Sequence, residues 1–99
     1  MDINISTEAD VTNVKVSGHL NTSTAPELEK ALSALGPAPA NLVVDLTDLE
    51  YLSSAGLRVL LGAKKTLDAT GGSFCVTNPC DDVREVFEIT GLLEIFNVR

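Results

Sequence analysis

The first part of the chain alternates apolar and polar residues, which predicts two strands paired as a hairpin. Alternation is clear over residues 3–5 and again over residues 13–17. A period of two places one set of side chains on a single face of a sheet. Residues 8–10, Glu-Ala-Asp, are expected to form the turn between the strands, and residues 18–21 are expected to form a loop after them.

Three later segments repeat apolar residues every three to four positions, which is the period of an amphipathic helix. The second of these predicted helices covers residues 54–69. Thr24 and Glu27 have the spacing of a capping box, and Asn78 followed by Pro79 is typical of a helix start. The apolar positions of the three segments are Leu28, Ala31, Leu32 and Leu35, then Leu57, Leu60, Leu61 and Leu67, and finally Val83, Val86 and Phe87.

Three short apolar runs between and after the helices predict the remaining strands. They cover residues 42–46, 74–76 and 92–96. The first run is apolar at consecutive positions, as expected for a strand covered on both faces. Residues 36–39, Gly-Pro-Ala-Pro, are expected to stop the first helix.

The predicted order β-β-α-β-α-β-α-β defines the fold class. Strands that alternate with helices indicate an α/β domain with a mostly parallel, mixed sheet of about five strands. The first hairpin adds an antiparallel edge to this sheet. Because the chain has no internal repeat and no long linker, residues 1–99 are expected to form a single domain.

The charge and hydropathy of the chain restrict its partners. The net charge is −7, and no cluster of Lys or Arg offsets it, so we expect no binding to nucleic acid. No apolar run approaches the roughly 18 residues that cross a bilayer, so we expect no direct membrane insertion. The N-terminus lacks the basic and apolar regions of a signal peptide, which favours a cytoplasmic protein.

The cysteines and the single histidine do not indicate a metal or cofactor site. Cys75 and Cys80 are expected to be buried free thiols in a reducing compartment. His19 is the only imidazole available as a further metal ligand. Asp45, Asp48 and Glu50 suggest a carboxylate pair or a cation site, but a solvated loop edge is the simpler interpretation. No glycine-rich phosphate-binding motif occurs, so no cofactor is expected.

Two adjacent serines lie where the run at residues 42–46 leads into the second helix. Ser53 and Ser54 are placed at the start of that helix, where serine is a favoured N-cap and an anion is welcome. A serine in the first turn could therefore hold a phosphate at low cost to the fold. A serine hydrolase is not favoured, because the first glycine of a G-x-S-x-G elbow is missing and His19 lies in a distant loop.

The stretch Asp45 to Leu57 resembles the signature of the STAS domains, named for sulfate transporters and anti-sigma factor antagonists. Features along nearly the whole chain are also similar to the family: the hairpin, the Gly18-x-Leu20 loop, Pro26 at a helix start, and Thr90-Gly91-Leu92. A free-standing domain of this length most resembles the bacterial anti-sigma factor antagonists. The resemblance implies a non-enzymatic binding protein of transcription regulation.

The resemblance also implies a partner switch. In such proteins an anti-sigma factor, itself a serine kinase, phosphorylates one serine at the start of the second helix, and a PP2C-type phosphatase reverses this. The unmodified antagonist binds the kinase, and the phosphorylated form is released. The matching position is Ser54. The expected partner-binding residues are Asn21, Thr22, Ser23, Ser53, Ser54, Gly56, Leu57 and Arg58.

Two positions depart from the family pattern. Ser53 stands where the family commonly has Asp, which makes it a rival phosphorylation site, and Asn21 stands where the family often has Asp. One alternative is that both serines are simply helix caps. Another is that the chain is a non-switching STAS subunit of a transporter or of a lipid-transport complex.

Overall fold

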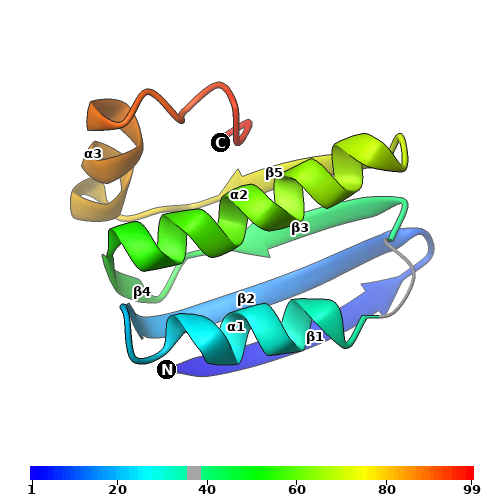
Figure 1. Ribbon diagram of the computed structural model, residues 1–99, viewed down its shortest axis with the longest axis horizontal. Coiled ribbons are helices and arrows are strands. Elements are labelled where there is room, and N and C mark those ends of the chain that lie inside the picture. The colour runs from blue at the N-terminus through cyan, green and yellow to red at the C-terminus, as the bar shows by residue number, and fades with distance from the viewer. Residues whose placement is uncertain (36–38) are drawn as a thin grey trace.

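The computed structural model describes residues 1–35 and 39–99, in which one five-stranded mixed sheet packs with three helices (Figure 1). The α/β fold class is therefore confirmed. Of the helix stop expected at residues 36–39, residues 36–38 lie outside the described residues. The elements are β1 (Asp2–Glu8), β2 (Val11–Leu20), α1 (Ala25–Ser33), β3 (Asn41–Asp45), β4 (Leu49–Leu52), α2 (Ser54–Ala69), β5 (Ser73–Thr77) and α3 (Asp81–Ile89).

The sheet has the order β1-β2-β3-β5, with β4 paired to the end of β2. The β1–β2 hairpin is antiparallel, as predicted, and the other pairings are parallel. The predicted loop at residues 18–21 is wrong for Gly18, His19 and Leu20. These residues continue β2 beyond a register shift and pair with β4, so β2 contacts β3 along its first half and β4 along its end.

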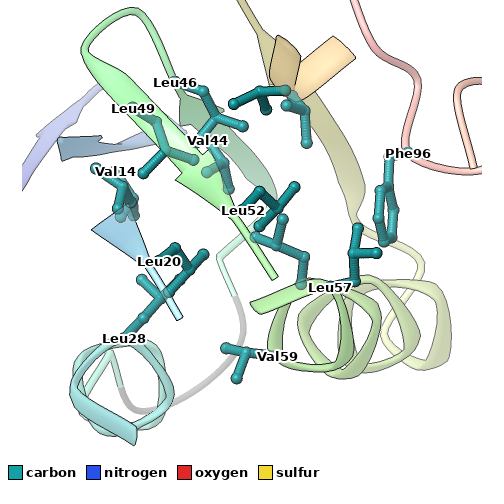
Figure 2. Close-up of a cluster of buried hydrophobic side chains, with 14 of the residues drawn as sticks. Val14, Leu20, Leu28, Val44, Leu46, Leu49, Leu52, Leu57, Val59 and Phe96 are labelled. Carbon is teal, nitrogen blue, oxygen red and sulfur yellow. The ribbon is translucent and has the colours of Figure 1, made fainter. Parts of the chain in front are cut away.

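The hydrophobic core lies between one face of the sheet and helices α1 and α2, which cover the same face (Figures 1 and 2). Alternate residues of each central strand are buried, including Val14, Val44 and Val76, while Val43 and Cys75 between them stay partly exposed. The prediction that β3 is covered on both faces is therefore wrong. Its consecutive apolar residues point alternately to a buried face and to a half-buried face of the sheet.

The predicted second helix is confirmed as α2, Ser54–Ala69. The predicted capping box of the first helix is wrong, although Thr24 does occupy the N-cap position of α1. The Thr24 hydroxyl donates to the carbonyl oxygen of His19 at 2.7 Å and accepts from the N–H of Asn21 at 2.9 Å. The hydroxyl is thus used inside the preceding loop and does not bond the α1 backbone.

The third helix begins later than predicted. Its N-cap is Cys80, not Asn78, because Asn78 has a positive φ of 56° and an N-cap normally needs an extended backbone. Both cysteines are free, but Cys80 is exposed and Cys75 is partly buried. The expectation that both thiols are buried is therefore wrong.

The predicted last strand at residues 92–96 is also wrong, because this segment forms turns that pack back on the core. Phe96 is fully buried, and its ring meets that of Phe87 edge-on at 5.6 Å between centroids. Val98 then forms an isolated parallel bridge with Val76 of β5. Burial of Phe96, not strand pairing, explains the apolar character of the segment.

Within residues 1–35 and 39–99, none of the helices has both the length and the apolar composition that a bilayer crossing requires.

Candidate functional site

Ser53 joins the end of the sheet to the first turn of α2. Its backbone is extended (φ −97°, ψ 172°), and its Oγ accepts a hydrogen bond from the Gly56 N–H at 3.4 Å. Its own N–H donates to the Leu20 carbonyl oxygen at 2.9 Å. The predicted capping role of Ser53 is confirmed, and it fixes where α2 starts relative to β2.

Ser54 is the first residue of α2, and its side chain is exposed. In the described part of the chain, the hydrogen bonds at this helix start involve Ser53, not the Ser54 hydroxyl. The first turn of α2 holds no acidic residue, so no carboxylate balances the partial positive charge of the helix N-terminus. Ser54 therefore presents an accessible hydroxyl where negative charge is favourable.

The loop between β2 and α1 supplies the second half of the predicted surface. The Asn21 Oδ1 accepts from the N–H groups of Ser23 and Thr24 at 2.9 Å and 3.1 Å. These bonds hold the loop in a tight turn and leave Thr22 and Ser23 exposed. Asn21 accepts both bonds as a neutral amide, so the missing family Asp is not needed for this turn.

The parallel pairing of β2 and β4 brings the two halves together. Leu20 and Leu52 are partners in register at the ends of these strands, and the segments that follow them are therefore neighbours. Gly56 packs against both leucines so closely that a Cβ there would lie 2.6 Å from the Leu20 Cγ. Of the predicted contact residues, Gly56 and Leu57 are buried and support the surface, while Thr22, Ser23, Ser54 and Arg58 are exposed.

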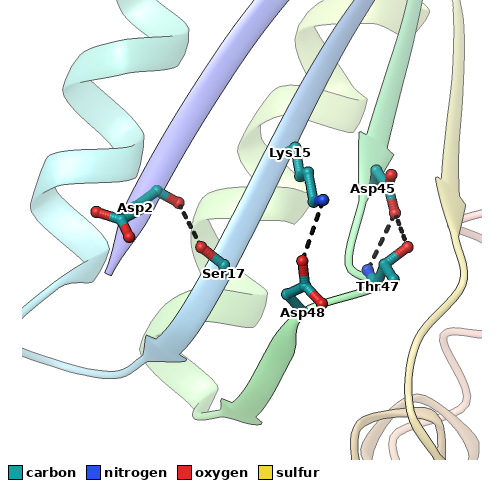
Figure 3. Close-up of polar contacts among 6 residues, drawn as sticks. All are labelled: Asp2, Lys15, Ser17, Asp45, Thr47 and Asp48. Carbon is teal, nitrogen blue, oxygen red and sulfur yellow. Dashed lines mark hydrogen bonds and ion pairs between the residues drawn. The ribbon is translucent and has the colours of Figure 1, made fainter.

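The acidic residues of the signature make contacts of their own (Figure 3). The Asp45 Oδ1 accepts from the Thr47 N–H at 3.0 Å and from the Thr47 hydroxyl at 2.6 Å. Asp48 pairs with the Lys15 Nζ at 3.0 Å, and this partnership raises the pKa of Lys15. Within the described residues, no group of three or more His, Cys, Asp or Glu side chains could hold a metal ion.

The Asp45→Asn substitution tests whether this carboxylate stabilises the turn. Partial burial acts to raise the pKa of Asp45, but the hydrogen bonds from Thr47 and Asn78 outweigh it and hold the pKa below its ordinary value of 3.8. A lowered folded-state pKa gives stability that is present above pH 3.8 and is lost as the pH falls through the folded pKa. We expect Asp45→Asn to be less stable at pH 7 by under about 1 kcal/mol, with the gap narrowing as the pH falls below 3.8.

Urea unfolding of both proteins at several pH values measures this gap. A gap that stays the same size from pH 7 down to the acid limit of the folded protein would mean that the charge of Asp45 contributes nothing to stability.

Sequence reasoning missed β4 and, with it, an exposed aromatic residue. Tyr51 is 51% exposed and is the register partner of His19. The two ring centroids are 6.2 Å apart, and the His19 Nε2 lies 3.6 Å from a Glu50 oxygen. His19 is therefore a strand residue beside Glu50 and Tyr51. Because Glu50 and Tyr51 stand between Leu49 and Leu52, this segment lacks the apolar run that predicted the other strands.

Arg58 lies between the Ser54 turn and a groove that separates α1 from α2. The groove has a volume of about 480 Å³ and a largely apolar lining. It is lined by Glu29, Leu32, Ser33, Leu35, Pro39, Leu42, Arg58, Val59, Gly62, Ala63, Thr66 and Leu67. The exposed face of α2 is thus continuous from the serine to the groove.

This fold and this helix start are those of a STAS domain: the family model of the STAS domain matches residues 2–99, and the chain belongs to that family. BtrV from Bordetella bronchiseptica, a candidate anti-sigma factor antagonist, is 42% identical over 84 residues, which is 84% of this chain and 72% of BtrV. The anti-sigma-B factor antagonist of Bacillus subtilis is 31% identical over 99% of this chain and 92% of its own.

A solved relative shows the same arrangement. The crystal structure of an anti-sigma factor antagonist from Mycobacterium paratuberculosis matches with a TM-score of 0.88 and 32% identity, covering 98% of this chain and 83% of that one. Relatives that carry the name anti-sigma factor antagonist therefore extend over almost the whole chain, including both halves of the candidate surface.

Proposed function

We propose that the protein is an anti-sigma factor antagonist whose binding is switched by phosphorylation of Ser54. In its unmodified form it binds an anti-sigma factor that is also a serine kinase, and this frees the sigma factor. Phosphorylation by that kinase releases the antagonist. The observation that carries the proposal is the exposed Ser54 hydroxyl at the start of α2, for which no hydrogen bond is found within the described residues. The chain's relatives are named anti-sigma factor antagonists.

In this reaction the chain is the acceptor of the phosphoryl group and not the enzyme. The Ser54 Oγ attacks the γ-phosphorus of ATP held by the kinase, the bond to the β-phosphate oxygen breaks, and ADP leaves. The hydroxyl proton passes to a base of the kinase. A PP2C-type phosphatase then hydrolyses the phosphoserine with water, which returns the hydroxyl and inorganic phosphate. These steps belong to the cytoplasm, where ATP is available.

Ser54 is a better acceptor than its rival Ser53. The Ser53 oxygen already accepts the Gly56 N–H, and Ser53 is only partly exposed. Transfer to Ser53 would disturb the cap, whose loss typically costs about 1 kcal/mol. Transfer to Ser54 leaves the cap intact and adds about two negative charges near a helix N-terminus.

The test is phosphorylation of the purified protein by its candidate anti-sigma factor kinase with ATP, followed by mapping of the phosphate by mass spectrometry. We expect one phosphate, on Ser54. The Ser54→Ala variant should accept none, whereas Ser53→Ala should still be labelled although its cap is lost. Label on Ser53 alone, or no label on either serine, would refute the switch.

The same pair of variants separates this function from a non-switching STAS subunit of a transporter or lipid-transport complex. Such a subunit would keep full activity as Ser54→Ala and would co-purify with membrane components. An antagonist that cannot be phosphorylated should instead stay bound to its kinase when ATP is added.

A further inference from the structure

Arg58 stands one helical turn after Ser54 on the same exposed face of α2. Residues four apart on a helix are neighbours on its surface. Side chains on a helix also lean toward its N-terminus, so the Arg58 side chain leans toward the turn that holds Ser54. Both residues are exposed, so their side chains can meet at the surface of the helix.

The surroundings of Arg58 leave its guanidinium available. The ion pairs among the described residues use Lys15, His19, Lys64 and Arg84 as the basic partners. On its own helix, the residue four positions later is Gly62, which offers no carboxylate. On the neighbouring helix, Glu29 lines the same groove as Arg58, but no ion pair joins them.

Two other pairs show that this spacing forms ion pairs in this molecule. The Lys64 Nζ lies 2.7 Å from Asp68 within α2, and the Arg84 Nε lies 3.5 Å from Glu88 within α3. A phosphate on Ser54 would give Arg58 a partner with the same separation. Guanidinium and phosphate are well matched, because two parallel N–H donors can meet two phosphate oxygens.

We propose that Arg58 is the receptor, within this same chain, for a phosphate on Ser54. The contact does two things at once: it neutralises part of the new charge inside the domain, and it withdraws Arg58 from the surface offered to the partner. Release then depends on a lost cation as well as on an added anion. This inference rests on the proposed phosphorylation of Ser54.

The test uses protein in which phosphoserine is installed at position 54 during translation, so that no kinase is needed. The second pKa of a phosphoserine is about 6 and can be followed by phosphorus NMR. A guanidinium nearby favours the dianion and lowers this pKa. We expect Arg58→Gln to raise the second pKa by about 0.3 units at low salt, a shift that about 1 M salt should remove.

Lys65→Gln is the matched control. Lys65 is also an exposed cation of α2, but the residue four positions before it is Leu61, so its loss should leave the phosphate pKa unchanged. Equal pKa values for the parent phosphoprotein and Arg58→Gln would overturn the inference, as would equal shifts in both variants. Failure of the kinase to label Ser54 would instead refute the proposed function, since the installed phosphoserine reports on Arg58 in either case.

Discussion

The Ser54→Asp substitution is expected to weaken binding to the anti-sigma factor kinase at least about tenfold, and installed phosphoserine about a hundredfold, which corresponds to about 1.4 and 2.7 kcal/mol. Ser54 is exposed in the first turn of α2, and the buried residues Gly56 and Leu57 pack that turn against the sheet. A partner surface that fits a hydroxyl would have to enclose the added charge, and desolvation of a charge costs several kcal/mol.

The control is Ser54→Asn, which has nearly the shape of the Asp variant without its charge. Calorimetric titration of the kinase with each variant should give weaker binding for Asp than for Asn at both low and moderate salt. An effect that vanishes at moderate salt would indicate long-range repulsion by a protein of net charge −7, and not exclusion from the interface. Equal affinities for Asp and Asn would show that size, not charge, controls release.

The elements that could be predicted from sequence are those in which local pattern and tertiary packing agree. The second helix is the clearest case: Ser53 caps it, Leu57, Leu60 and Leu67 are buried on one face, and the observed bounds match the predicted ones. The hairpin follows from the strict alternation of β2, in which Val14 and Val16 are fully buried. In both elements, the residues that define the period are also the residues that fill the core.

The elements that were missed depend on contacts far apart in the sequence. β4 has only four residues, two of them exposed, and it exists because Leu49 and Leu52 face the core beside the end of β2. The same pairing turned the expected loop at Gly18 into strand. At the C-terminus, the apolar residues around Phe96 predict a strand, because apolar residues of turns and of short strands cannot be told apart by period alone.

In the candidate site, too, the features set by local sequence could be predicted, and those set by contacts far apart in the sequence could not. The serines at the helix start could be recognised because capping is a local effect, and Ser53 does cap α2. The burial of Gly56 could not, because it depends on two leucines from β2 and β4. The lateral position of Asn21 and Ser23 beside that helix also follows from the β2–β4 pairing, which no periodicity reveals.

The Gly56→Ala substitution is expected to destabilise the protein by about 1–2 kcal/mol. A Cβ at this position would lie 2.6 Å from the Leu20 Cγ and 2.8 Å from the Leu52 Cδ1, distances that real side chains do not tolerate. Overpacking of this kind costs about 1–3 kcal/mol, which outweighs the gain of up to about 1 kcal/mol in helix propensity. The strain affects the contact of Gly56 with Leu20 and Leu52, which positions the Ser53–Ser54 turn against the sheet. Kinase binding should therefore weaken as well. Urea unfolding measures the loss of stability.

Gly62→Ala in the same helix is the matched control. It makes the same chemical change where, among the described residues, nothing beyond the adjacent residues and the backbone of its own helix lies within 4 Å of the added Cβ. Here only the helix propensity and the entropy of the unfolded chain change, so this variant should gain about 0.5–1 kcal/mol. Opposite signs for the two substitutions would show that the close approach of α2 to the ends of β2 and β4 limits position 56 to glycine. If both variants gained stability, the leucines could move aside, and the packing at position 56 would not require glycine.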